Sequence, residues 1–166
     1  MLVIALVVFQ RRTAGGDLPR TALLPAWLRL TLGVQGVLVL ALGVALLVRP
    51  LDVAPLWPWS LTVLTGRAMG AWLAAIGATA LQAVWENDLR RTRLFLLGYT
   101  LVGLLELVAL VRYPATVQWG MPSVWVWVGF LGSLTVVGPA GLRVARRVRA
   151  RQGPVAQSTL VVMRAR

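Results

Sequence analysis

The sequence contains no cysteine and no histidine, and it also contains no lysine, since all 17 basic residues are arginine. These absences exclude disulfides, iron–sulfur clusters, His-ligated haem or zinc, Ser-His-Asp triads, Schiff-base lysines and the P-loop lysine. Acidic residues are scarce as well, with five in 166 residues. The sequence therefore predicts no metal site, no cofactor and no enzymatic activity.

Apolar residues, by contrast, are abundant. They make up 58% of the chain, and the mean hydropathy is +0.78, whereas soluble domains average about 45–50% apolar residues. The net charge of +12 is compatible with nucleic-acid binding, but the arginines lie between apolar runs and at the C-terminus. We therefore interpret them as topology signals that face anionic lipid headgroups, and we expect no nucleic-acid partner.

The apolar runs predict an all-α transmembrane helical bundle with four full spans between residues 27 and 142. The predicted spans cover residues 28–48, 66–85, 94–111 and 123–142. Residues 1–9 are apolar but rise about 14 Å as a helix against a hydrocarbon core of about 30 Å. They predict a partial span, followed by a cytoplasmic or interfacial loop at 10–26. Residues 143–166 predict a flexible basic tail on the cytoplasmic side.

The arginines of successive connections predict the topology. Residues 10–29, 49–67, 86–93, 112–122 and 143–166 contain 4, 2, 3, 1 and 7 arginines, respectively. Because cytoplasmic loops carry the excess of positive charge, the first, third and fifth segments are predicted to be cytoplasmic. The expected product is a multi-pass protein of the plasma (cytoplasmic) membrane with a cytoplasmic C-terminus.

Small residues recur in the second predicted span. Gly66, Gly70, Ala74 and Ala78 are spaced by four, so on a helix they form a stripe along which a second helix can approach closely. This stripe predicts tight helix packing, either inside the bundle or with a homo-oligomer or membrane-protein partner.

Three polar side chains interrupt the predicted spans. Glu106 lies roughly 7–8 Å inside the end of the third span, where a carboxylate needs a partner or a proton. Arg67 begins the preceding span at the same face, and it either snorkels to headgroups or pairs with Glu106. Arg67 and Glu106 together predict either a structural contact or a functional site, which would relay protons or bind a ligand. Gln35 predicts an interhelical hydrogen bond in preference to substrate binding.

Tryptophans cluster beside these spans. Trp57 and Trp59 flank Pro58, which rules out a regular helix there, and Trp72 lies one turn beyond Arg67. Aromatic side chains at this density are typical of the headgroup layer. A segment that caps a ligand is the alternative interpretation.

Residues 57–72, WPWSLTVLTGRAMGAW, carry a WPW-x-LT-x-LT-x-R-x-x-GAW pattern. This pattern resembles that of a group of integral membrane proteins of high-GC bacteria, and the similarity extends over about residues 20–140. The resemblance implies a polytopic membrane protein and brings no particular activity, cofactor or ligand with it.

Two functions follow from this sequence. The first is a non-enzymatic structural or accessory membrane component that pairs through small-residue faces. The alternative is a small-molecule or proton-handling carrier whose site lies near Arg67 and Glu106, bordered by Trp57, Trp59 and Trp72. A carrier predicts a cavity that contains the charged groups, whereas an accessory bundle predicts that they are paired and buried.

Overall fold

The computed structural model describes residues 23–164, and for Arg90 and residues 147–164 it describes the backbone alone. This part of the chain is helical and contains no strand. The long helices are α2 (Ala26–Val48), α4 (Val63–Glu86), α5 (Leu89–Arg112) and α6 (Pro122–Arg164), and the short ones are α3 (Pro50–Val53), η1 (Ala54–Leu56) and η2 (Pro114–Thr116). The predicted partial span at 1–9 lies outside the described residues.

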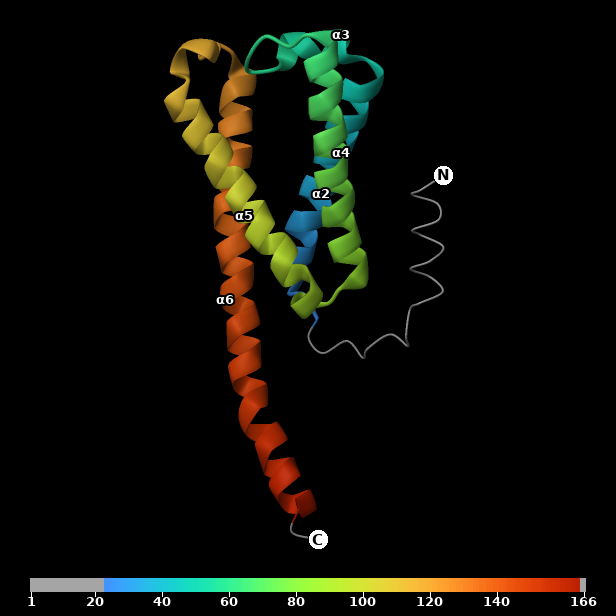
Figure 1. The fold of residues 1–166 in the computed structure, drawn as a ribbon, viewed down its shortest axis with the longest axis vertical. Helices are drawn as coiled ribbons and strands as arrows, with labels where there is room; N and C mark the ends of the chain where they lie inside the picture. Colours follow the sequence, from blue (N-terminus) through green and yellow to red (C-terminus); the bar gives the residue numbers. More distant parts are fainter. Residues whose placement is uncertain (1–22, 165–166) are drawn as a thin grey trace.

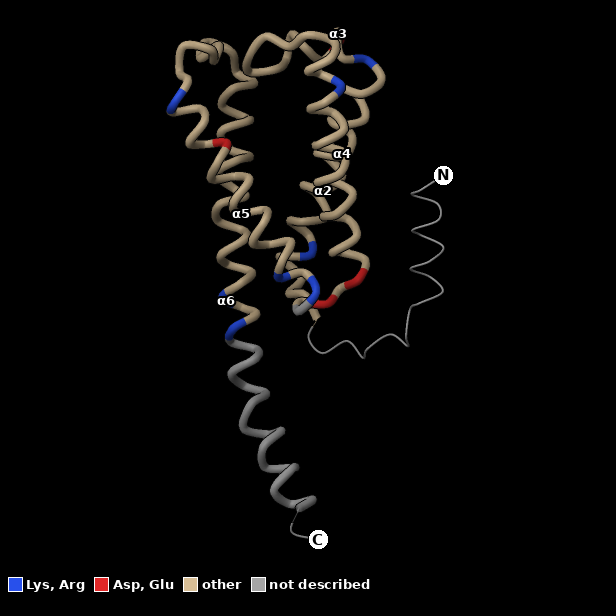
Figure 2. Tube along the Cα trace, in the orientation of Figure 1, with Lys and Arg blue, Asp and Glu red and all other residues tan. Residues whose placement is uncertain are grey.

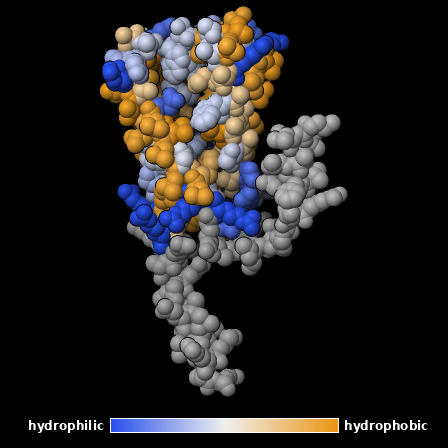
Figure 3. All heavy atoms as spheres, viewed as in Figure 1, coloured by the Kyte–Doolittle hydropathy of each residue, from blue (hydrophilic) through white to orange (hydrophobic). Residues whose placement is uncertain are grey.

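Four of these helices are long and apolar enough to cross a membrane. The all-α prediction is therefore confirmed, and the architecture is compatible with a multi-pass integral membrane protein. Apolar side chains cover the middle of the molecule, and hydrophilic residues gather toward its two ends (Figure 3). Most of the charged residues follow the same division (Figure 2).

The helices form two pairs. α2 packs along α4 and α5 packs along α6, while α4 and α5 contact each other little. In Figure 1 the two pairs converge near the α4–α5 turn and separate toward the opposite end. We call the end that contains Asn87 the turn end, and the end that contains residues 49–62 and 113–121 the loop end.

Local sequence sets the ends of α4. At its start, the Thr62 hydroxyl accepts a hydrogen bond from the Thr65 amide, and the Thr65 hydroxyl accepts one from the Thr62 amide. This reciprocal capping box satisfies two amides that would otherwise lack partners. Asn87 ends the helix with a left-handed φ of 47°, a conformation that Asn tolerates better than most residues.

Glycines bring the backbones of α2 and α4 together. A β-carbon on Gly77 would lie 2.5 Å from the Leu40 amide nitrogen and 2.8 Å from the Gly36 carbonyl oxygen. Gly43 faces the backbone of Gly70 and Ala74 in the same way. Two helices can approach this closely where glycine removes a side chain from the contact, so the predicted tight packing is found inside the bundle.

The predicted small-residue stripe is correct at one end and wrong at the other. Gly66 and Gly70 are buried, but Ala78 is exposed and Gly77 takes its place against α2. A helix advances 3.6 residues per turn, so a strict four-residue spacing rotates away from the partner after two or three turns. The buried face then continues through Gly77 and Ala80.

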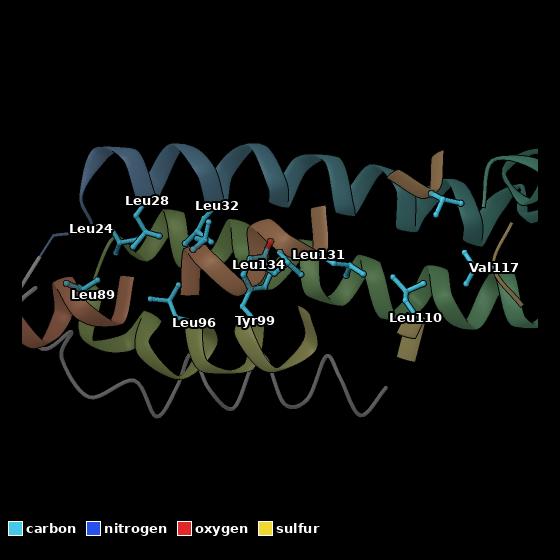
Figure 4. Packing of buried hydrophobic residues seen from close by; sticks show 12 residues of the cluster. Leu24, Leu28, Leu32, Leu89, Leu96, Tyr99, Leu110, Val117, Leu131 and Leu134 are labelled. Carbon is cyan, nitrogen blue, oxygen red and sulfur yellow. The ribbon is translucent and has the colours of Figure 1, made fainter. Parts of the chain in front are cut away.

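A layer of aliphatic side chains joins the two pairs toward the turn end (Figure 4). Leu28 and Leu32 of α2 belong to the same buried cluster as Leu96 of α5 and Leu131 and Leu134 of α6. All five are at most 2% exposed. This layer joins α2 to α5 and α6, whereas α4 and α5 make few contacts with each other.

Helix α6 is longer than predicted. It continues through Gly138 and Pro139 and extends to Arg164, whereas the sequence predicts a span that ends near residue 142 and a flexible tail. Arginine and alanine are good helix formers, and they are frequent just beyond residue 142. Gly138 faces the Leu96 carbonyl and Thr100 of α5, so its missing side chain lets the two helices approach closely there.

Candidate functional site

The two connections at the loop end touch each other. The Gln118 amide donates a hydrogen bond of 2.9 Å to the Pro58 carbonyl, which links the α2–α4 connection to the α5–α6 connection. The second connection is stiffened internally, since the Trp119 indole donates to the Pro114 carbonyl at 2.8 Å. The pairs that separate toward this end are therefore bridged by their loops (Figure 1).

The sequence predicts that Trp57 lies in an exposed headgroup belt, and the structure shows that it does not. It is 3% exposed and packs in a cluster with Val39, Leu46 and Leu73 of α2 and α4. Pro58 prevents a helix at this point, and the extended Trp57 backbone turns the indole inward. Trp57 and Pro58 are thus buried in the bundle, while Leu56 and Ser60 on either side of them stay exposed.

An aromatic cluster extends from Trp57 toward the second helix pair. The Trp57 ring meets Trp59 edge-on, with centroids 5.4 Å apart, and lies 5.0 Å from Trp127 of α6. Trp127 in turn lies 5.5 Å from Phe130. Aromatic pairs at these separations add about 0.5–1.5 kcal/mol each beyond burial, so this cluster holds the first connection against α6.

Beside this cluster lies an open cavity of about 680 Å³. Its lining combines one carboxyl group, two aromatic rings, several hydroxyl or amide groups and aliphatic side chains. The lining residues are Trp59, Ser60, Glu106, Ala109, Leu110, Tyr113, Ala115, Thr116, Val117 and Gln118. None of these residues is an arginine, so Glu106 provides the formal charge of the wall.

Glu106 also lines a second, more enclosed cavity deeper in the bundle. This inner cavity has a volume of about 20 Å³ and is bordered by Trp72, Leu73, Trp127 and Leu134, among others. A volume of this size can hold about one water molecule. Glu106 thus lines both the open cavity and the inner one.

The carboxylate of Glu106 has no partner among the side chains that the structure describes, because neither a hydrogen bond nor an ion pair from it is present among them. The predicted pair with Arg67 is accordingly not formed. Arg67 is exposed on α4, and α4 and α5 make few contacts with each other. Arg67 and Glu106 therefore do not meet, although they lie near the same end of consecutive spans. Arg67 borders neither cavity.

Gln35 makes the interhelical hydrogen bonds that the sequence predicts. Its amide nitrogen donates to the Ser133 hydroxyl at 2.7 Å, and its carbonyl oxygen accepts from the Tyr99 hydroxyl at 3.1 Å. The Ser133 hydroxyl donates onward to the Phe130 carbonyl at 2.6 Å. Gln35 therefore ties α2 to both α5 and α6 and is separate from the Glu106 cavities.

Of the predicted site residues, the structure brings three to the two cavities and leaves three outside their walls. Glu106 borders both cavities, Trp59 borders the open one and Trp72 the inner one. Trp57 lines neither cavity but contacts the lining residues Trp59 and Trp127. Arg67 and Gln35 lie elsewhere.

Sequence reasoning missed one pattern on α5. Thr92, Tyr99 and Glu106 recur every seventh residue and share one face of α5, and Tyr113, seven residues further, follows directly after the end of the helix. Thr92 and Tyr99 are buried, Glu106 is half-buried, and Tyr113 lines the open cavity. A count of polar residues at a spacing of seven would have found this polar face and placed Glu106 toward the bundle interior.

Two buried indole donors close to this region also lack partners. The Nε1 atoms of Trp57 and Trp127 are inaccessible and have no acceptor among the described residues. A buried N–H without an acceptor costs about 1–3 kcal/mol. The aromatic cluster thus retains hydrogen-bonding capacity at the border between the two helix pairs.

No protein-family model, no curated protein and no solved structure matches this chain. The resemblance carried by residues 57–72 therefore remains a prediction, and the function rests on the geometry of the site.

Proposed function

We propose that this chain is a non-enzymatic, multi-pass membrane carrier that binds a small organic cation in the cavity beside Glu106. The observation that supports the proposal is the Glu106 carboxylate, which has no partner within the described part of the chain and faces a cavity of about 680 Å³. Ligand sites commonly measure about 300–1,000 Å³. An acidic group inside a membrane span is rare and usually functional.

The composition of the wall indicates the charge of the ligand. The carboxylate attracts a cation, and the attraction is stronger in a low-dielectric surrounding than in water. The indole of Trp59 offers an aromatic face for cation–π contact, whereas the Tyr113 ring already has the Arg112 guanidinium 5.6 Å from its centroid. The aliphatic Leu110 and Val117 favour an organic cation over a hydrated metal ion.

The shared position of Glu106 supports a carrier in preference to a receptor. Carriers commonly hold their substrate at one fixed point and change access around that point. Here the carboxylate borders both an open cavity and an enclosed one. A proton can compete for the same carboxylate, so proton coupling is part of the proposal.

The orientation belongs to the proposal as well. The turn end, with its connection at residues 86–93, carries more arginine than the loop end. Because positive residues favour the cytoplasmic side, we propose that the turn end and the C-terminus face the cytoplasm of a plasma membrane. The open cavity then faces outward.

Tetraphenylphosphonium and tetraphenylborate provide a test, because these ions share one shape and have opposite charges. We expect proteoliposomes to retain more of the cation than protein-free vesicles of the same lipid do, with no protein-dependent retention of the anion. Glu106→Gln should weaken cation binding about tenfold, or about 1.4 kcal/mol. Glu86→Gln, which changes a carboxyl group at the turn end, is the matched control.

Equal cation binding by wild type and Glu106→Gln would refute the site. Binding without uptake into the vesicle lumen would retain the site and reject transport. Protein-dependent retention of tetraphenylborate, at a level similar to that of the cation, would show that the cavity selects shape and hydrophobicity and not charge.

The second candidate is an accessory membrane component, and one observation favours it. Ala68, Ala71, Ala75, Ala78 and Gln82 alternate by three and four residues along α4 and are all exposed. Such a face allows close approach of a partner helix. Ala75→Leu should then shift the oligomeric state or the co-purifying partner without changing cation binding.

A further inference from the structure

An apolar groove lies on the α2–α4 pair near the turn end, far along the chain from the Glu106 cavity. It has a volume of about 730 Å³. Its walls are Leu30, Val34, Val37 and Leu38 of α2 with Leu81 and Val84 of α4. The four α2 side chains are between 51% and 70% exposed. The described part of the chain therefore leaves them largely uncovered.

Gly33 forms the middle of this groove. A β-carbon placed on Gly33 would meet nothing within 4 Å, in contrast to Gly36, whose β-carbon would lie 3.0 Å from the Leu81 side chain. Gly33 is therefore not needed for helix packing. Its missing side chain leaves a channel on the surface of α2.

The groove has a polar rim at one end. Arg29 and Asn87 belong to its lining, and Arg29 is exposed with no ion pair to another residue of the described chain. The side-chain oxygen Oδ1 of Asn87 accepts a hydrogen bond of 3.2 Å from the Leu24 amide. The side-chain NH₂ group of Asn87 is the remaining donor. Both rim groups can thus donate hydrogen bonds to an anion.

The length of the groove matches one lipid leaflet. Arg29 and Leu38 are nine residues apart on one helix, or about 14 Å along its axis. Half of a hydrocarbon core of about 30 Å is about 15 Å. An acyl chain that follows the groove therefore places its headgroup at the Arg29 rim, where arginine and phosphate pair favourably.

From this combination of shape and charge we infer that the groove is a binding site for one anionic phospholipid, with an acyl chain over Gly33 and the headgroup at Arg29. The surroundings favour a net negative charge over a zwitterion. Arginines outnumber the acidic Glu86 and Asp88 around the turn end (Figure 2), and an anionic surface attracts each nearby arginine with about 1 kcal/mol.

Native mass spectrometry of the full chain, released from bilayers that contain equal phosphatidylglycerol and phosphatidylcholine with identical acyl chains, tests this inference. We expect one phosphatidylglycerol to be retained per chain in preference to phosphatidylcholine. Gly33→Phe should fill the channel and lower retention about tenfold. Gly98→Phe is the control, because Gly98 lies on α5 and its β-carbon would also meet nothing within 4 Å.

Arg29→Gln supplies a second variant that removes no buried contact. It should abolish the preference for phosphatidylglycerol while phosphatidylcholine is still retained. Equal retention of the two lipids by wild type, an unchanged Gly33→Phe protein, or an equal loss in Gly98→Phe would each overturn the inference.

Residues 1–9, apolar and outside the described chain, are the competing occupant. A double variant, Ala5→Cys with Gly33→Cys, distinguishes this case because the natural chain has no cysteine. Efficient disulfide formation in the bilayer would assign the groove to that segment and overturn the lipid site. The inference predicts that the disulfide does not form and that lipid retention is unaffected by Ala5→Cys alone.

Discussion

Gly77→Ala tests whether the backbone contact between α2 and α4 stabilises the fold. The new β-carbon would lie 2.5 Å from the Leu40 nitrogen, about 0.9 Å short of the 3.4 Å at which ordinary contact begins, and the Gly36 carbonyl oxygen is also too close at 2.8 Å. Both obstacles are backbone atoms, so a rotamer change cannot remove them. The helices must separate by nearly 1 Å.

The expected cost follows from general overpacking data. Insertion of one methyl group into a packed core costs typically about 1–3 kcal/mol, while replacement of a helical glycine by alanine returns about 1 kcal/mol of helix propensity. Because separation of α2 from α4 affects several turns, we expect a net loss of about 1–2 kcal/mol. That loss is roughly a 5- to 30-fold change in the unfolding equilibrium.

Steric trapping or reversible denaturation in mixed micelles measures this free energy. Gly98→Ala is the matched control, because the same substitution there meets nothing within 4 Å and should be neutral or stabilising by helix propensity. If Gly77→Ala and Gly98→Ala changed the free energy of unfolding equally, the close contact between α2 and α4 would not contribute to stability, and the reasoning would be refuted.

Three further predictions concern other parts of the molecule. Gln35→Leu should destabilise the protein by about 1 kcal/mol, with a coupling of about 0.6 kcal/mol to Tyr99→Phe in a double-mutant cycle; additive effects would contradict the bond. Trp57→Ala should cost about 3–5 kcal/mol of stability, whereas Trp85→Ala, at a site 85% exposed, should cost little. The same denaturation experiment measures both, and similar losses would argue against a buried Trp57. Single cysteines at Ser60 and Gln118 should react with a membrane-impermeant maleimide from one side and a cysteine at Glu86 from the other; labelling of all three from one side would contradict the four-span topology.

The helices themselves were predictable from hydropathy. The second span was predicted at residues 66–85, and helix α4 covers Val63–Glu86. The first was predicted at residues 28–48, and helix α2 covers Ala26–Val48. Apolar runs set these bounds because a bilayer demands a minimum length and helical hydrogen bonding. The α6 end was missed, since hydropathy reports where an apolar span stops and not where a helix stops.

The partners of each helix were not predictable in the same way. Small residues indicate that a close approach can occur, but Gly66 and Gly70 do not specify whether α2, α5 or a second chain makes it. The pairing depends on matching glycines on the partner, here Gly36 and Gly43 of α2. Such a match involves two segments far apart in the sequence, so a pattern within one span cannot reveal it.

The sequence predicted one part of the site, Glu106, but not the residues that surround it. An isolated acid in an apolar run identified Glu106, because a membrane makes such a group costly. Of the two alternatives for Arg67, the pair with Glu106 is not formed, because that pair requires α4 and α5 to pack closely and they make few contacts. Trp57 was misplaced because aromatic residues next to a proline resemble a headgroup belt, and the sequence does not reveal that this connection folds inward.

The unequal packing of the two interfaces indicates how a carrier built on this fold would move. α2 and α4 are joined backbone to backbone at Gly43 and Gly77, so they must move as one rigid body. The Gln35 bonds to Tyr99 and Ser133 fix that body against α5 and α6, two helical turns from Glu106 along α5. Little contact joins α4 to α5. In such a carrier, access to Glu106 would change by rotation of one pair against the other about the Gln35 contact. The loop-end hydrogen bond between Gln118 and Pro58 and the packing of Trp57 on Trp127 are then the contacts that must yield.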